Sequence, residues 1–182
     1  MKITSGVYSG IPITVPGGRS VRPTLSKTRQ SLFNMLRGKI EGLKCVDFFG
    51  GSGALGFEAM SNGAESAVFV ENKYGSMIYK NAAKLKISRE RFSVIKADFR
   101  KGLAALEKKG YKAGIIFADP PYNRGFAEIF LKLLEKSDIL VRNGYVVIEV
   151  HRDEASALKP EKLRVLKEKK YGETVVLLLE NS

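Results

Sequence analysis

The sequence predicts an α/β protein built on a mostly parallel sheet of seven strands, and three observations lead to this prediction. From residue 42 onward, short apolar runs alternate with segments of helical periodicity, which is typical of βα units. The end of the chain instead shows alternating runs joined by glycine-containing turns, which indicates an antiparallel edge. A chain of 182 residues that is 44% hydrophobic has room for one domain with its own core.

The first 43 residues differ from the rest in residue pattern and charge, and they are expected to form a basic extension, with residues 44–182 as the main domain. Gly and Pro interrupt short alternating stretches at 2–4 and 11–15, so we expect a small hairpin, followed by a helix that begins near Thr24. The extension holds seven Lys or Arg residues against one acid, Glu41. A basic surface is therefore expected there.

The main domain is predicted to begin with four parallel strands, at 44–49, 67–71, 92–96 and 114–118. A helix follows the fourth strand, because apolar side chains recur from Phe126 to Leu134 at the spacing of one helix face. Three more strands, at 144–150, 163–167 and 174–179, complete the predicted sheet.

Composition limits the classes of partner. The formal net charge of +12 favours a polyanionic partner, since Lys and Arg neutralise phosphates. The sequence has neither an apolar run of membrane-spanning length nor a signal-peptide pattern, so a cytoplasmic protein without membrane contact is expected. One cysteine cannot build a disulfide framework or a thiolate cluster, and no metal is expected.

The first chemical motif is a glycine-rich turn after the first predicted strand. Gly51, Gly53 and Gly56 match G-x-G-x-x-G, whose glycines allow a tight turn and a close approach of backbone to ligand. This pattern alone is compatible with nicotinamide, flavin and methyl-donor cofactors. Asp47 at the strand end favours S-adenosylmethionine, because that cofactor carries a cationic amino group and a sulfonium. Cofactor contacts are expected at Asp47 and at 51–53, which includes Ser52.

Acidic residues also follow the second and third predicted strands. Glu71, with Asn72 beside it, lies where an acid accepts hydrogen bonds from a ribose diol. Asp98 could accept from an adenine amino group while Phe99 lines the ring, or it could cap the next helix, and both interpretations stay open.

The most informative motif is Asp119-Pro120-Pro121-Tyr122 at the end of the fourth predicted strand. Its two prolines stiffen the turn and remove amide donors, so Asp119 and backbone carbonyls remain as acceptors for an amino group. Tyr122 is expected to stack on the target base, a contact worth ~1–3 kcal/mol. The motif predicts methylation of an exocyclic amine, with these four residues as the catalytic set.

The chain resembles the RsmD family of small-subunit ribosomal RNA guanine-N2 methyltransferases over nearly its whole length. The resemblance is carried by Arg22-Pro23-Thr24, by Arg29 with the following Leu32-Phe33-Asn34, and by the closing 170–174 stretch; it departs from the family at Ser26, Lys27 and Gln30. It implies a protein with a Rossmann-like class I methyltransferase fold that acts on 16S ribosomal RNA within the small subunit or its assembly intermediate. A monomer is expected.

Three arginines are expected to bind this substrate together with Tyr122. Arg19 and Arg22 are expected to contact phosphates. Arg29 shares one helix face with Leu32 and Leu36, so its guanidinium could reach the active cleft or pair internally.

Two other classes of function fit part of the sequence. A methyltransferase for DNA adenine N6 or for a protein glutamine is compatible with the 119–122 motif, but a DNA enzyme normally needs a target-recognition insertion for which this chain has no room. A dinucleotide-binding oxidoreductase or a catalytically silent RNA-binding module would explain the glycines and the basic extension, but not the 119–122 motif.

Overall fold

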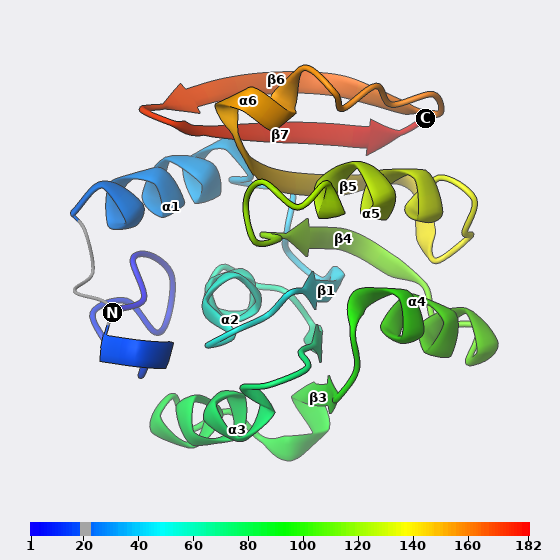
Figure 1. Ribbon diagram of the computed structural model, residues 1–182. Helices are drawn as coiled ribbons and strands as arrows, with labels where there is room; N and C mark the ends of the chain where they lie inside the picture. The colour runs from blue at the N-terminus through cyan, green and yellow to red at the C-terminus, as the bar shows by residue number, and fades with distance from the viewer. Residues whose placement is uncertain (19–22) are drawn as a thin grey trace.

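The computed structural model describes residues 1–18 and 23–182, with only the backbone described for 23–26. Its centre is a twisted sheet with helices on both faces (Figure 1). No helix in this described part of the chain is long and apolar enough to cross a membrane.

The sheet has seven strands in the order β3-β2-β1-β4-β5-β7-β6, which confirms the predicted α/β fold. The first five strands run parallel, and β7 pairs antiparallel with both β5 and β6. The strands are β1 (Lys44–Phe48), β2 (Ser66–Val70), β3 (Phe92–Ile95), β4 (Ala113–Ala118), β5 (Leu140–His151), β6 (Leu163–Tyr171) and β7 (Thr174–Asn181).

Two apolar cores fill the space between the sheet and its two helical layers. One core joins the sheet to α4 and α5, and the other joins it to α1, α2 and α3 (Figure 1). The helices are α1 (Pro23–Met35), α2 (Ala54–Ser61), α3 (Gly75–Lys84), α4 (Phe99–Lys108), α5 (Phe126–Leu134) and α6 (Arg152–Ala155), with short 3-10 turns η1 (Pro16–Gly18) and η2 (Arg89–Arg91).

The N-terminal segment folds back on itself and packs against α2. The expected hairpin is reduced to a single antiparallel bridge between Lys2 and Pro12, and Pro12 has no amide to donate to a longer ladder. The amide of Val7 donates to the Ser61 carbonyl at the end of α2, 2.8 Å away. Ile3 and Ile13 are buried in the core that also contains α1, α2 and α3, so the segment shares the interior of the main domain.

The fifth strand is longer than the sequence predicts. It already begins at Leu140, which pairs with Ala113, and the register then shifts before Tyr145 pairs with Ile115. Asn143 has a positive φ of 58° inside this irregular stretch. The polar residues of the bulge hide the first half of the strand from a search for apolar alternation.

Candidate active site

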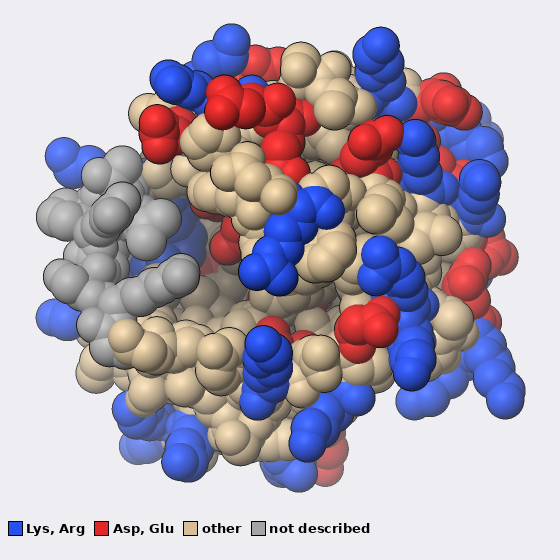
Figure 2. Space-filling view, in the orientation of Figure 1, with Lys and Arg blue, Asp and Glu red and all other residues tan. Residues whose placement is uncertain are grey.

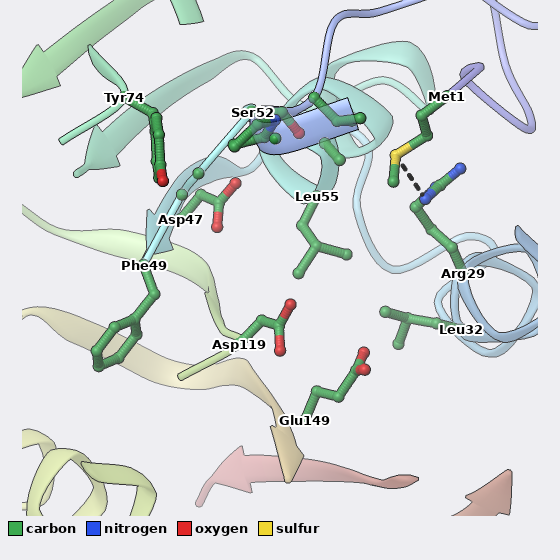
Figure 3. A pocket seen from close by; sticks show the side chains of 16 residues that line it. Met1, Arg29, Leu32, Asp47, Phe49, Ser52, Leu55, Tyr74, Asp119 and Glu149 are labelled. Carbon is green, nitrogen blue, oxygen red and sulfur yellow. Dashed lines mark hydrogen bonds between the residues drawn. The ribbon is translucent and has the colours of Figure 1, made fainter. Parts of the chain in front are cut away.

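The carboxyl ends of β1, β4 and β5 meet at one edge of the sheet and border a cavity of about 500 Å³. This volume lies in the range of small-molecule sites. Asp47, Asp119 and Glu149 line the cavity, and their carboxylates point into it (Figure 3). In the described part of the chain, no group of three or more His, Cys, Asp or Glu side chains is arranged to hold a metal ion.

The glycine-rich turn forms the wall of the cavity between β1 and α2. Gly51 and Gly53 have positive φ angles of 53° and 82°, which L side chains rarely adopt. A Cβ on Gly56 would lie 2.3 Å from the Phe69 ring on β2, so this position needs glycine for close packing of helix and strand. Ser52 is buried, and its carbonyl accepts a hydrogen bond from the Asn81 side chain at 2.8 Å.

Asp47 is a buried carboxylate at the base of this turn. Its Oδ2 accepts the Gly56 amide at 2.9 Å. Burial raises the pKa of Asp47 to about 8, and the negative charge of Glu71 adds to the rise, while the Gly56 hydrogen bond opposes it. A cationic group in the cavity would favour the ionised carboxylate and so oppose this shift, which makes the site suitable for a positively charged ligand.

Glu71 connects the glycine-rich turn to the segment before α3. One carboxylate oxygen accepts the Gly51 amide at 2.7 Å, and the other accepts the amides of Lys73 at 2.6 Å and Tyr74 at 3.1 Å. A carboxylate has about four acceptor positions, which leaves room for one more donor. Glu71 and the exposed Asn72 are outside the residues that line the cavity, whereas Tyr74, which sequence reasoning missed, is one of them.

Asp98 and Phe99 occupy the start of α4. Asp98 caps the helix by accepting the amides of Arg100 at 2.8 Å and Lys101 at 3.2 Å. Phe99 is buried, with its ring centroid 4.9 Å from that of Phe49. Neither Asp98 nor Phe99 lines the cavity, although Phe49 does. The capping role of Asp98 is therefore visible, and the adenine contacts of both residues stay predictions.

The 119–122 turn follows β4 directly and places Asp119 at the cavity and Tyr122 beside β5. The Tyr122 hydroxyl donates to Oε1 of Glu149 at 3.0 Å and is also 3.0 Å from the Thr174 hydroxyl. Tyr122 as a whole residue keeps 36% of its surface exposed, so it is accessible to a partner. Pro120 is buried and Pro121 is exposed.

Glu149 is a titratable residue of the cavity that sequence reasoning missed. Burial raises its pKa, while the Tyr122 hydrogen bond and the nearby charge of Arg29 lower it. The signal in the sequence is a single acid inside the apolar run 146–150, a run that by itself predicts only a strand.

Arg29 borders the cavity, but its guanidinium is held by neighbours in the protein. Nε lies 2.9 Å from Oε1 of Glu58, Nη2 donates to the Lys2 carbonyl at 2.9 Å, and Nη1 is 3.0 Å from the Met1 sulfur. Internal pairing is thus present, and substrate binding by Arg29 stays a prediction. Arg19 and Arg22 lie outside the described residues.

Comparisons with known proteins place the chain among ribosomal RNA methyltransferases. A family model described as "Conserved hypothetical protein 95" matches residues 1–180. The chain is 31% identical to "Ribosomal RNA small subunit methyltransferase D" of Escherichia coli K12, covering 99% of this chain and 89% of the relative. It is also 31% identical to the protein of that name from Haemophilus influenzae, covering 100% of this chain and 94% of the relative. The solved structure of yhhF from Escherichia coli superimposes with a TM-score of 0.84 at 31% identity, covering 100% and 98% of the two chains.

Proposed function

The chain belongs to the RsmD family, whose model is described as "Conserved hypothetical protein 95", and from this we propose that it methylates the exocyclic N2 amine of a guanine in 16S ribosomal RNA with S-adenosylmethionine. One observation carries the proposal: Asp47 and Asp119, the predicted cofactor and acceptor carboxylates, face the same cavity (Figure 3). The fold is that of the class I methyltransferases.

The residues present fit this cofactor. S-adenosylmethionine supplies an electrophilic methyl group from a sulfonium sulfur, which keeps the electron pair of the broken bond. Asp47 would bind the cationic amino group, because its carboxyl lies at the cavity and a cation there would offset the cost of ionising it in a buried position. The backbone at Gly51 and Gly53 allows close approach, and Glu71 has an acceptor position left for a ribose hydroxyl.

Asp119 would act on the acceptor amine. An aromatic amine delocalises its lone pair into the ring, so hydrogen-bond acceptors must hold the N–H bonds while the nitrogen becomes pyramidal. Asp119 supplies one such acceptor at the cavity, and Pro120 removes an amide donor that would compete for it. When the nitrogen has gained its methyl group, it carries a positive charge and releases a proton, for which Asp119 is an acceptor within reach. The exposed ring of Tyr122 would stack on the base.

The proposed substrate context is the small ribosomal subunit or an assembly intermediate, bound by a cytoplasmic monomer. The charge distribution supports an RNA partner: Figure 2 shows Lys and Arg around the hollow on this face and acidic side chains inside it. The formal net charge of +12 favours a polyanion generally. Arg19 and Arg22 are proposed phosphate contacts.

Transfer of labelled methyl groups tests the proposal. Small subunits that lack the modification, naked ribosomal RNA, DNA and a protein extract are incubated with enzyme and labelled S-adenosylmethionine, and the methylated unit is identified after digestion. We expect N2-methylguanosine from the subunits or their RNA. Label in N6-methyladenosine or in glutamine would contradict the proposed acceptor.

The role of Asp119 is tested with a matched pair of variants. Asp119→Ala is expected to lower the transfer rate at least ~100-fold while the Kd for the cofactor stays within twofold, because the carboxylate acts on the amine. Asp138→Ala is the control, since Asp138 is an exposed carboxylate just before β5, paired with Lys112. Equal turnover of the two variants would remove Asp119 from the mechanism.

A further inference from the structure

We infer that Glu149 selects guanine as the acceptor by taking a hydrogen bond from the N1–H of the target base while Asp119 holds the neighbouring N2 amine. This inference rests on the proposed function, because it assigns a reader to the edge of the base that the enzyme methylates. It adds a specificity-determining residue that lies outside the 119–122 motif.

The sheet places Glu149 directly beside Asp119. β4 and β5 are parallel neighbours, and Ala118 at the end of β4 pairs with Ile148. Asp119 and Glu149 are the residues that follow this pair, one after each strand partner, and adjacent strands lie about 4.8 Å apart. Figure 3 shows both carboxylates pointing into the same part of the cavity. A planar group that reaches one of them therefore meets the other along its edge.

Glu149 is fixed in position and has an acceptor available. Its Oε1 is held by the Tyr122 hydroxyl, which is itself 3.0 Å from Thr174. Among the described residues, Oε2 receives no hydrogen bond. Arg29 lies close enough for its charge to favour the ionised form, while burial of the carboxylate works in the opposite direction. A desolvated acceptor of fixed orientation discriminates strongly between a donor and an acceptor placed opposite it.

The three candidate acceptors differ at the atom beside the amine. In guanine, the N2 amine is next to N1–H, which is a donor. In adenine, the N6 amine is next to an unprotonated N1, and in a glutamine side chain the amide nitrogen is next to a carbonyl oxygen, so both present an acceptor. An ionised Glu149 attracts the N1–H donor of guanine and repels the acceptor that adenine or glutamine presents at this place. The 119–122 motif alone does not distinguish the three, because each offers an amine to it. Reading of a flipped base by hydrogen bonds to this edge is a common mode of recognition.

The test uses 2-aminopurine, which keeps the amine of guanine but has an unprotonated N1. Small subunits are reconstituted with RNA in which the mapped target guanosine is retained or replaced by 2-aminopurine ribonucleoside, and the rates of methyl transfer are compared. The wild-type protein is expected to prefer guanine by about 10- to 100-fold. In Glu149→Gln the side-chain amide can donate to the unprotonated N1, so the preference is expected to fall to within about threefold.

Two further variants keep the result interpretable. Glu180→Gln is the matched control, because Glu180 is a carboxylate on β7 that pairs with Arg164, and its guanine preference should equal that of wild type. Tyr122→Phe keeps the aromatic ring but removes the hydrogen bond that orients Glu149, so it should lower the preference partially and carries the test if Glu149→Gln does not fold. Unfolding temperature and cofactor Kd are measured for every variant.

The outcomes separate this inference from the proposed function. A wild-type enzyme that forms N2-methylguanosine, together with a Glu149→Gln variant of unchanged guanine preference, would overturn the role of Glu149 and leave the function standing. A wild-type enzyme that uses 2-aminopurine as well as guanine would also overturn it. Absence of N2-methylguanosine with the wild-type protein would instead contradict the proposed function itself.

Discussion

Replacement of Arg29 by methionine tests whether this arginine stabilises the fold or binds RNA. Arg29 is 6% exposed and its partner Glu58 is fully buried, with Nε and Oε1 2.9 Å apart. In Arg29→Met, the Glu58 carboxylate keeps the Thr4 amide at 2.6 Å but loses its countercharge. Removal of one partner from a buried ion pair costs about 3–5 kcal/mol in the free energy of unfolding. For a chain of 182 residues this corresponds to a fall of about 6–20 °C in Tm.

A double-mutant cycle measures how much of this loss belongs to the pair. Arg29→Met, Glu58→Gln and the double variant are unfolded by urea and by heat, and the binding of small subunits is measured for each. Both single variants should be destabilised, and the double variant should be more stable than the sum of the single losses by at least ~2 kcal/mol. The reasoning is refuted if Arg29→Met keeps wild-type stability and loses only affinity for the subunit, since the arginine would then act at the substrate.

Three further predictions concern the cofactor, the glycines and the RNA surface. At pH 7, below the raised pKa of Asp47, binding of S-adenosylmethionine should release up to about one proton, because a cation favours the ionised carboxylate. Calorimetry in buffers of different ionisation enthalpy measures this release, and Asp47→Asn should show none. Gly56→Ala should lower the free energy of unfolding by ~1–3 kcal/mol in a urea titration, because the new Cβ would lie 2.3 Å from the Phe69 ring. Gly75→Ala is the control: the nearest contact of its Cβ is at 3.4 Å, so this variant should be neutral or stabilising in the same titration. Charge reversal at Arg19 or Arg22 should weaken subunit binding and reduce the slope of log affinity against log salt by about 1 each; a wild-type slope would place the RNA surface elsewhere.

The parts of the fold that the sequence predicts well are those whose signal is local. Buried parallel strands are continuous apolar runs, and the predicted bounds of β1 to β4 agree with the observed ones to within about one residue. The start of β5 depends on a bulge opposite Ala113, and the N-terminal bridge depends on packing against α2. Both features arise from contacts between segments far apart in the chain, so no local pattern reveals them.

In the candidate site too, residues with a local sequence signal are predictable, and residues whose role depends on a distant partner are not. Asp47 and Asp119 are predictable because parallel strands bring their carboxyl ends to one edge. Glu149 is missed because its partner Tyr122 is 27 residues away and its neighbours in sequence are apolar. Arg29 could not be assigned from the face of its helix, since Glu58, which decides its pairing, lies 29 residues further on.

The charges at the site select which part of an RNA can enter. Asp47, Asp119 and Glu149 line the cavity with oxygen acceptors, so it suits groups that donate hydrogen bonds better than phosphate groups. Lys and Arg around the hollow have the opposite preference (Figure 2). An RNA strand can satisfy both only if its backbone stays at the rim and a base turns inward with its amine and N1–H leading. A duplex keeps these donors paired, so the arrangement favours a guanine in an exposed loop, whose unpairing costs least.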